Sequence, residues 1–350
     1  MTRSDGTILH PGFTPPYILE RLREHGSPRQ RRCAEATLTR DRGFRAARGP
    51  QRAARKPEAS APGRPARYIH SAEHRETLPG RLVREEDQPG GDDPAVEEAY
   101  RWLGATYRFF WEVFERHSID ANGMPLIGTV HFGQDYANAF WNGAQMVFGD
   151  GDDELFRRFT IAVDVVAHEL AHGVTERESG LVYAGQSGAL NESLSDVFGS
   201  LVKQFHRGER AAQADWLIGA ELLTEAVQGR ALRSMAEPGS AFDDPVLGRD
   251  PQPAHMDQFV VTQTDNGGVH INSGIPNRAF YLAAQALDGY AWEVAGQVWY
   301  ATLRDSRLSP DIDFAGFAAL TVDNADRSYG RQSREQQAIR DAWQAVGVRV

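Results

Sequence analysis

The spacing of apolar residues predicts regular structure from about residue 68 onward. Between Ala95 and Phe114 apolar side chains recur every three or four positions, which indicates an amphipathic helix. Alternation of apolar and polar residues predicts a strand over 127–132. A cluster of glycine and aspartate at 149–153 predicts a loop, and the spacing after it predicts a helix over about 154–175.

The second half of the chain has helical spacing almost throughout, with glycine- and proline-rich loops between the helices. The sequence therefore predicts an α+β protein, with a mixed α/β half, a helix around residue 167, and a mainly α-helical half. The helices expected in the second half cover residues 194–205, 216–226, 277–287, 291–304, 314–325 and 334–346.

The first 67 residues have a different composition. Arginines recur among alanine, glycine and proline, and large apolar residues are few, so we expect most of this segment to pack poorly. An apolar patch at 13–22 is the exception and has the character of a docking surface. The arginines leave two interpretations open, a nucleic-acid-binding tail or a cover for another part of the same chain.

The charge distribution favours the second interpretation. Residues 1–67 carry fifteen lysines and arginines against six acidic residues, a net charge of +9. The rest of the chain carries 23 of the 38 basic and 42 of the 48 acidic residues, a net charge of −19. With 41% hydrophobic and 25% charged residues, the composition excludes a wholly disordered chain, and no apolar run is long enough to span a membrane.

Two features bear on the cellular compartment. Cys33 is the single cysteine, so no disulfide forms within the chain. The residues after Met1 lack the apolar core of a secretory signal peptide. Both features suit a cytoplasmic protein, and they suit equally a protein that is exported without a classical signal.

The decisive chemical motif runs from His168 to His172. These two histidines, four positions apart, lie one turn from each other on one face of a helix, which is the separation that Zn²⁺ needs from two ligands. Glu169 points to the side of them, where it can address a metal-bound water. The alternative is an accidental match on a buried helix.

Glu192 supplies a third ligand. It lies 24 residues after His168, so a second helix that crosses the first would bring its carboxylate to the zinc. Two imidazoles, one carboxylate and an open position are typical of a catalytic zinc site. Asp196, one turn further on, could accept a hydrogen bond from a ligating histidine and fix its tautomer, although surface helices also carry such carboxylates for solubility.

With these motifs the sequence resembles the thermolysin family of zinc metalloendopeptidases. The resemblance runs from about residue 68 to the end of the chain. It implies a two-lobed thermolysin-like zincin fold, with a β-rich N-terminal lobe, a mainly helical C-terminal lobe and the active-site helix between them. Three further blocks occur in the family's order, namely Asn138–Gly143, Leu232–Met235 and Asp265–Ile275.

The resemblance implies a role for each matching residue. His168, His172 and Glu192 would hold one zinc ion, and Glu169 would act as the general base that activates a zinc-bound water. The developing oxyanion would be stabilised by the zinc and by three residues, with His270 and Tyr183 as donors and Asp265 orienting His270. The substrate would bind as an added strand held by Asn138, Ala139 and Arg233.

An apolar pocket would follow the scissile bond and favour cleavage on the amino side of large hydrophobic residues. Some of the matching residues are expected to be ordinary core residues instead. The matching positions are Phe156, Phe159, Val165, Ile218, Leu222 and Leu232.

The sequence departs from the family at a double calcium site that calcium-rich members carry. Asp164 and Asp215 remain, but Lys203, Leu217 and Ala220 hold the other matching positions. Ca²⁺ is bound by oxygen atoms, which an ammonium group lacks. We therefore expect no calcium at this site, and we expect Lys203 to pair with Asp164, Asp215 or both.

The short N-terminal piece resembles the brief propeptide of the protealysin-like subgroup, with Pro15, Pro16 and Tyr17 as its motif. The implied parts are a basic propeptide over 1–66, an N-terminal catalytic lobe with the zinc helix over 67–180, and a helical C-terminal lobe over 181–350. The propeptide would act as an intramolecular inhibitor and be removed by self-cleavage.

The expected partners are protein or peptide substrates, and a proteinaceous inhibitor remains open. We expect a monomer that binds neither nucleic acid nor a membrane, and an extracellular location reached by a non-classical route in preference to the cytoplasm. Three alternatives are kept: a zinc-capping thiol at Cys33, a nucleic-acid-binding tail, and an inactive binding homologue. The last would lack a zinc ligand, the base or an oxyanion donor, and the sequence has them all.

Overall fold

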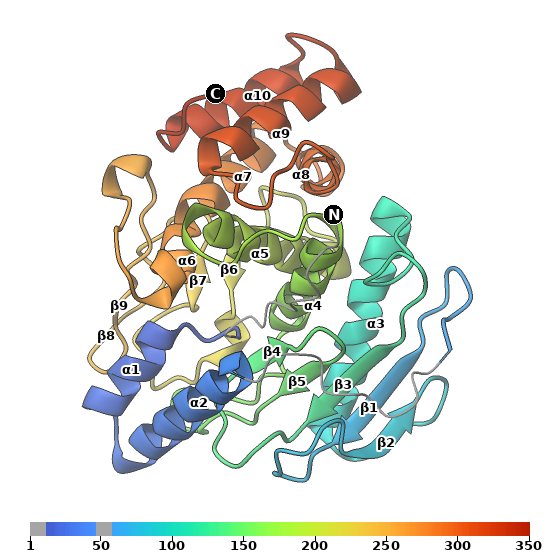
Figure 1. Cartoon of the computed structure of the whole chain (residues 1–350), viewed down its shortest axis with the longest axis vertical. Helices are drawn as coiled ribbons and strands as arrows, with labels where there is room; N and C mark the ends of the chain where they lie inside the picture. The colour runs from blue at the N-terminus through green and yellow to red at the C-terminus, as the bar shows by residue number, and fades with distance from the viewer. Residues whose placement is uncertain (1–11, 47–57) are drawn as a thin grey trace.

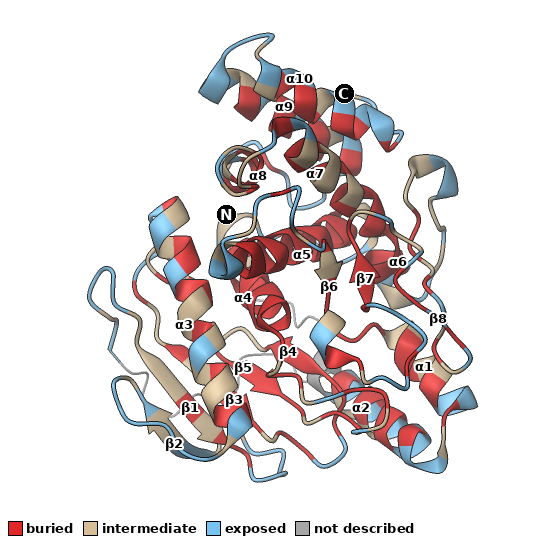
Figure 2. Ribbon diagram, turned by 180° about the vertical axis from the view of Figure 1, so that it is seen from behind, coloured by how far each residue is buried: buried red, intermediate tan, exposed pale blue. Residues whose placement is uncertain are grey.

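The computed structural model describes residues 12–46 and 58–350. A five-stranded sheet lies on one side of two long helices, α4 (Val163–Glu178) and α5 (Gly185–Arg207), and the C-terminal helices lie on the other side (Figure 1). Most of α4 and α5 is buried (Figure 2). The α+β, two-lobed arrangement expected from the sequence is confirmed.

The sheet belongs to the N-terminal lobe, and its strand order is β2-β1-β3-β5-β4. The three central strands, β1, β3 and β5, run parallel, and the edge strands β2 and β4 run antiparallel to their neighbours. Because β4 lies at an edge, one side of it is open to pairing with another extended segment. The bounds are β1 Arg67–Ser71, β2 Arg81–Glu85, β3 Leu126–Val130, β4 Ala139–Trp141 and β5 Met146–Phe148.

Helix α3 (Pro94–Phe114) packs against the sheet, as the apolar spacing predicts. The carboxylate of Asp93 caps its first turn by accepting a hydrogen bond from the backbone N–H of Ala95. Pro94 occupies the first helical position, where a missing N–H costs nothing. The apolar face of α3, which includes Leu103 and Phe110, is buried.

The C-terminal lobe is built from helices, as predicted. Short strand pairs, β6 with β7 and β8 with β9, lie in the connection before them. The bounds are β8 Asp243–Asp244, β9 Gly248–Arg249, α6 Asp265–Asn272, α7 Gly274–Leu287, α8 Ala295–Leu303, α9 Phe314–Tyr329 and α10 Arg334–Ala345.

The predicted helix over 154–175 is wrong at its start, because α4 begins at Val163. The carboxylate of Asp152 accepts hydrogen bonds of 3.1, 2.9 and 2.8 Å from the backbone N–H groups of the residues at 154, 155 and 156, which closes a turn. Phe156 then forms an antiparallel bridge with Leu223. This distant partner overrides the local helical spacing.

The predicted helix over 216–226 is also wrong. Trp216 and Gly219 have left-handed backbone angles, with φ of 54° and 69°, which interrupt any helix. Between them β6 (Leu217–Ile218) pairs with β7 (Arg233–Ser234), and a short 3₁₀ turn follows over Ala220–Leu222. Again a pairing partner far along the chain decides the conformation.

Residues 28–46 pack better than their composition suggests, so the expectation of poor packing is wrong there, whereas the apolar patch at 13–22 is docked as expected. The segment forms two neighbouring helices, α1 (Pro16–His25) and α2 (Pro28–Ala46) (Figure 1), and α2 forms hydrogen bonds with the loop before β4. Residues 1–11 and 47–57 of the expected propeptide lie outside the described residues. The buried side chains of the two helices include Ile18, Leu19, Leu22, Cys33, Ala34, Thr37, Leu38 and Asp41.

A glycine brings α4 and α5 close together. A Cβ atom at Gly199 would lie 2.7 Å from the carbonyl oxygen of Asp164 and 3.4 Å from the Cβ of His168. The absence of a side chain there lets the zinc-motif helix rest directly on its neighbour. Within the described residues, none of the helices has the length and apolar character needed to cross a membrane.

Candidate metal centre and active site

Three side chains from α4 and α5 converge at the crossing of the two helices. The Nε2 atoms of His168 and His172 lie 3.1 Å apart. The carboxylate of Glu192 lies 3.5 Å from the first of these atoms and 3.4 Å from the second. The three predicted ligands are therefore together and buried.

Each histidine is held by a hydrogen bond on its other ring nitrogen. Nδ1 of His168 lies 2.8 Å from Asp196 Oδ1, and Nδ1 of His172 lies 2.8 Å from Asn191 Oδ1. Such partners fix the tautomer in which Nε2 can bind a metal. Asp196 therefore lies where the sequence places it.

Asp196 is itself held by a buried arginine. Arg233, from β7, donates two hydrogen bonds of 2.8 Å to its two carboxylate oxygens. Burial alone would raise the pKa of Asp196, but the charges of Arg233 and His168 outweigh it and lower that pKa to about 2. The carboxylate stays ionised and can orient His168 across the neutral pH range.

Glu169 lies beside the histidine pair, with its carboxylate buried. The backbone N–H of Trp141 donates a 2.9 Å hydrogen bond to Oε2 of Glu169. The other oxygen, Oε1, has no hydrogen-bond partner among the described residues. Burial raises the pKa of Glu169 to about 8, so this carboxyl group binds a proton more readily than an ordinary glutamate does.

His270, Tyr183 and Asp265 also gather beside Glu192. Nδ1 of His270 lies 2.6 Å from Asp265 Oδ1, and Nε2 of His270 lies 3.4 Å from the hydroxyl of Tyr183 and 3.6 Å from Glu192. The tyrosine hydroxyl also donates to Glu192. A run of left-handed residues at 266–268 bends the start of α6, and the Asp265 carboxylate also accepts a 2.8 Å bond from the backbone N–H of His270.

A short segment of the N-terminal piece lies on the predicted substrate-binding residues. The backbone N–H of Phe13 donates a 2.9 Å hydrogen bond to the carbonyl oxygen of Ala139. The next N–H, of Thr14, donates a 2.8 Å bond to Asn138 Oδ1. The carbonyl oxygen of Phe13 accepts a 3.4 Å bond from Nη1 of Arg233. Asn138, Ala139 and Arg233 thus contact one stretch of backbone.

The side chain of Phe13 is fully buried beside the metal centre. Its ring meets the ring of His168 edge-on, with the centroids 5.1 Å apart. A Cβ atom at Gly219 would lie 3.0 Å from the Phe13 ring and 3.5 Å from Leu232. The predicted pocket residues Phe159, Val165 and Leu232 belong to the same buried apolar cluster as Phe13.

The proline motif starts the helix that follows this segment. Pro15 caps α1 and Pro16 begins it, with fixed backbone angles that suit a first turn. Tyr17 is half-buried, with its hydroxyl oxygen shielded from solvent, and this burial together with the nearby Asp250 raises the pKa of the hydroxyl above the ordinary value. The three residues therefore place Phe13 rather than enter the metal centre.

Cys33 does not cap the metal centre. It lies on α2, and its thiol donates a 3.2 Å hydrogen bond to the carbonyl oxygen of Asp135. Burial, reinforced by the charges of Asp152 and Asp135, raises the pKa of the thiol to about 12. The structure contradicts the alternative of a zinc-capping thiol.

Lys203 pairs with both Asp164 and Asp215, the carboxylates at positions that match the family's double calcium site. Nζ of Lys203 lies 3.2 Å from Asp164 Oδ2 and 2.8 Å from Asp215 Oδ1, and it also donates to the carbonyl oxygen of Leu217. The backbone N–H of Gly219 donates a 3.2 Å bond to the same Asp164 oxygen. An ammonium group thus occupies the space between these carboxylates.

Sequence reasoning missed several supporting residues. Asn191 and Ser195 lie one turn apart on α5, and both contact Nδ1 of His172, at 2.8 and 3.0 Å. Asn277 donates a 2.9 Å bond to Asp196. The spacing of Asn191 and Ser195 around Glu192 was a usable signal. Phe13 was marked only as part of the apolar patch at 13–22, and nothing local marks Asn277.

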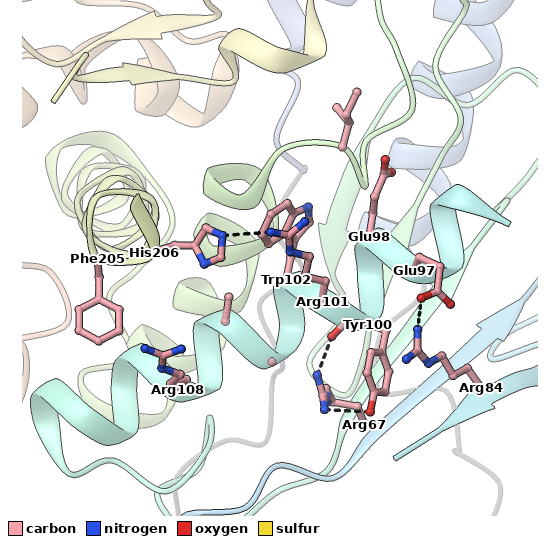
Figure 3. A pocket seen from close by; sticks show the side chains of 13 residues that line it. Arg67, Arg84, Glu97, Glu98, Tyr100, Arg101, Trp102, Arg108, Phe205 and His206 are labelled. Atoms are coloured by element: carbon pink, nitrogen blue, oxygen red, sulfur yellow. Dashed lines mark hydrogen bonds and ion pairs between the residues drawn. The ribbon is translucent and has the colours of Figure 1, made fainter. Parts of the chain in front are cut away.

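A cavity of about 670 Å³ lies away from this site, between α3 and the end of α5 (Figure 3). Its guanidinium groups are already engaged: Arg84 pairs with Glu97, and Arg67 contacts Tyr100, whose ring lies between both arginines. It contains none of the predicted catalytic or ligating residues.

Comparison with known families agrees with this geometry. The family described as thermolysin metallopeptidase, catalytic domain, matches residues 59–176. The family described as thermolysin metallopeptidase, alpha-helical domain, matches residues 179–348. The boundary between the two falls at the C-terminal end of α4, between the two histidines and Glu192 in the sequence.

Individual relatives extend the match to the N-terminal piece. An extracellular metalloprotease of Pectobacterium carotovorum subsp. carotovorum is 56% identical over 337 residues, which is 96% of each chain. A thermolysin of Alicyclobacillus acidocaldarius subsp. acidocaldarius is 38% identical over 290 residues, which is 80% of this chain and 50% of that protein. The solved structure of the precursor of protealysin, a metalloproteinase from Serratia proteamaculans, is similar with a TM-score of 0.89 and 55% identity over 96% of this chain and 99% of that one. The chain therefore belongs to the thermolysin family of metallopeptidases, the zinc endopeptidases that its sequence resembles.

Proposed function

We propose that this protein is made as a latent precursor of a zinc endopeptidase that cleaves peptide bonds on the amino side of large hydrophobic residues. One observation carries the proposal: Phe13 and Thr14 bind Asn138, Ala139 and Arg233 through backbone groups while the Phe13 side chain is buried beside the metal centre. A substrate in the same position would present a large apolar side chain to the same pocket.

The donor set suits zinc. The two Nε2 atoms lie 3.1 Å apart, and the Glu192 carboxylate is near both, with Oε2 3.5 Å from His168 and Oε1 3.4 Å from His172. These separations are close to the donor spacing around one tetrahedral ion, about 3.3 Å for bonds of about 2 Å. Glu192 Oε2 is buried without a hydrogen-bond partner among the described residues, as a metal-ligating oxygen would be. Bound by His168, His172 and Glu192, zinc would supply Lewis acidity and a water of lowered pKa.

Glu169 is the proposed general base. Its Oε1 has no protein partner within the described chain, and the Trp141 N–H fixes its other oxygen. A carboxyl group whose pKa is raised by burial can accept the proton of the attacking water and return it to the leaving amine. Geometry supports the assignment, since Glu169 follows His168 directly on the same buried helix.

His270 and Tyr183 are the proposed donors to the developing oxyanion. Their donor atoms lie 3.4 Å apart, close enough to address one oxygen together. Asp265 accepts the hydrogen of His270 Nδ1. Burial alone would lower the pKa of His270, but the charges of Asp265 and Glu192 outweigh it and raise that pKa, so a protonated ring can also donate from Nε2. Asp265 is therefore a positioning residue.

Residues 1–66 are the proposed propeptide, which acts as an intramolecular inhibitor of the catalytic lobes at 67–180 and 181–350. The segment at Phe13 blocks the cleft. Helix α2 holds this segment in place, because α2 forms hydrogen bonds with the loop before β4. Among these, Tyr136 donates a 2.7 Å bond to Asp41, and the N–H of Ala137 donates a 3.0 Å bond to Thr37. Arg40 contacts Glu76 and the carbonyl of Gln134, so part of the basic charge faces the acidic half.

We propose that the enzyme acts outside the cell on protein or peptide substrates. Relatives that bear extracellular names support this location. We also propose that the mature enzyme needs no calcium at the former double site, because Lys203 neutralises the two carboxylates there. A monomer without affinity for nucleic acid remains our expectation.

Cleavage-site mapping tests the specificity. Peptides that differ only in one central residue, Leu, Phe, Ala or Lys, are digested with the processed enzyme, and mass spectrometry locates the cut. We expect cleavage directly before Leu and Phe, and at least about tenfold slower cleavage before Ala, since each methylene lost from the pocket costs about 1–3 kcal/mol. Cleavage after the central residue, or equal rates for all four peptides, would contradict the proposal.

A further inference from the structure

Three adjacent parallel strands end at the same edge of the sheet, and each is followed by a potential metal ligand. His131 comes directly after β3, Asp150 comes two residues after β5, and His74 comes three residues after β1. The register pairs Ser71 with Val130 and thus aligns the ends of β1 and β3. The crevice at the carboxyl ends of parallel strands is a common place for ligand sites.

The donor atoms of these side chains are close together. Nδ1 of His131 lies 2.9 and 3.1 Å from the two carboxylate oxygens of Asp150. Nδ1 of His74 lies 3.3 Å from Oδ2 of the same carboxylate. Around a tetrahedral ion with bonds of about 2.0–2.2 Å, neighbouring donors lie about 3.3–3.5 Å apart, so small side-chain movements would seat one ion among the three.

The ring of His131 is oriented as in many metal sites. Its Nε2 is bound by Asp93 Oδ2 at 2.9 Å, which leaves Nδ1 to face Asp150 and His74. A carboxylate on the far nitrogen is the usual support of a ligating histidine. Asp93 is in turn fixed, because its other oxygen caps α3 through a 2.9 Å bond from the N–H of Ala95.

The backbone around the ligands is held in place rather than loose. His74 and His131 both have left-handed conformations, with φ of 61° and 53°, which cost energy for residues with a side chain. The N–H of His74 donates a 2.9 Å bond to the carbonyl oxygen of His131, and the N–H of Gly133 donates one of 2.9 Å to that of Arg75. The two loops are therefore tied together with the imidazoles on the same side of Asp150.

We propose that His74, His131 and Asp150 form a second metal site, which takes a divalent transition metal such as Zn²⁺, Co²⁺ or Ni²⁺. Two imidazoles favour these ions over Ca²⁺ and Mg²⁺, which take oxygen ligands. His74 is largely exposed, so the ion enters from solvent and keeps water at its remaining positions. The site shares no residue with the histidine pair of α4 and does not depend on the proposed function.

Cobalt binding tests the site on the full-length chain that carries one equivalent of zinc. The protein is titrated with Co²⁺, the visible absorption of the cobalt is followed, and both metals are quantified after gel filtration. We expect one Co²⁺ per chain with the zinc retained. His74→Ala should abolish the cobalt uptake, and Asp93→Asn, which keeps a capping side chain, should weaken it by about 10–100-fold.

The matched control is His206→Ala, which removes a histidine whose charged neighbours are arginines. It should bind cobalt as the wild type does. Because His74 is exposed, His74→Ala should unfold at the wild-type temperature without cobalt, and only the wild type should gain stability when cobalt is added. The inference is overturned if the wild type takes up no Co²⁺, if Co²⁺ merely replaces the zinc, or if His74→Ala binds as much cobalt as the wild type.

Discussion

The backbone N–H of Phe13 donates a 2.9 Å hydrogen bond to the carbonyl oxygen of Ala139, on the open edge of the sheet. This hydrogen bond holds the N-terminal piece against the edge strand β4, although the backbone bends at Phe13 and Thr14. In the proposed function a peptide substrate binds at the same edge, so propeptide and substrate would compete for one place.

Replacing the side chain of Phe13 should weaken latency. Removing a fully buried phenylalanine ring costs about 3–5 kcal/mol of packing, so the Phe13→Ala precursor should hydrolyse a fluorogenic peptide at least about tenfold faster per intact chain than the wild-type precursor. Phe13→Leu is the matched control, because it keeps a large apolar side chain and should remain nearly latent. Equal initial rates for all three precursors would show that Phe13 does not block the cleft.

Maturation should depend on Glu169. The wild-type precursor and its Glu169→Ala variant are incubated side by side, and the chain length is followed over time. We expect the wild type to be shortened while the variant stays intact. Processing at the same rate in both would rule out self-cleavage.

The rate of that processing is informative as well. Between Phe44 and Tyr68 the sequence has no large apolar residue, so a hydrophobic pocket gains little from any bond in this stretch. Processing should therefore be slower than hydrolysis of a peptide that presents Leu or Phe.

The thiol of Cys33 reports on propeptide docking. The side chain is 2% exposed, and burial raises its pKa to about 12, so hardly any reactive thiolate is present at neutral pH. A maleimide should label the intact precursor far more slowly than the urea-unfolded chain, and labelling should accelerate as the propeptide is released. Rapid labelling of the native, uncleaved precursor would contradict the docking of α2.

Lys203 should be essential for stability at neutral pH. Lys203→Ala leaves two carboxylates without their buried cation, which should cost about 3–5 kcal/mol in the free energy of unfolding. The exposed pair of Arg81 with Glu73 gives a control, since Arg81→Ala should cost less than about 1 kcal/mol.

The effect of Lys203 should also depend on pH. Burial raises the pKa of Asp215, but Lys203 outweighs this and holds that pKa below its ordinary value. A carboxyl group whose pKa is lower in the folded than in the unfolded state stabilises the fold at pH values above its unfolded-state pKa. This stability is lost as the pH falls through the folded-state pKa. The gap in unfolding free energy between wild type and Lys203→Ala should therefore shrink in acid. A gap that is absent at neutral pH, or that widens in acid, would contradict this account.

The metal motif was readable from the sequence because its geometry is local. His168 and His172 share a helical face by spacing alone, and Glu169 follows from the same helix. The third ligand needed a second helix at the right crossing, and Gly199 makes that crossing close. The position of Glu192, 24 residues after His168, suggested such a crossing, and the resemblance to a family supported it.

The rest could not be read locally. The stretch near Trp216 has helical spacing but pairs with β7, and the stretch before Val163 is tied to Leu223. The docking face of α2 consists of small and polar residues such as Thr37 and Asp41, whose partners lie about a hundred positions away, at separations of 100 and 95. Burial by such a face leaves no hydrophobic pattern in the sequence.

The central claim is that zinc held by His168, His172 and Glu192 makes this chain a peptidase. The direct test measures zinc content and peptide hydrolysis on the same processed sample, before and after treatment with phenanthroline and again after zinc is restored. We predict one zinc per chain, loss of hydrolysis together with the zinc, and recovery of both. A fully processed, zinc-loaded protein that cleaves no peptide, or hydrolysis that survives complete removal of the zinc, would contradict the account.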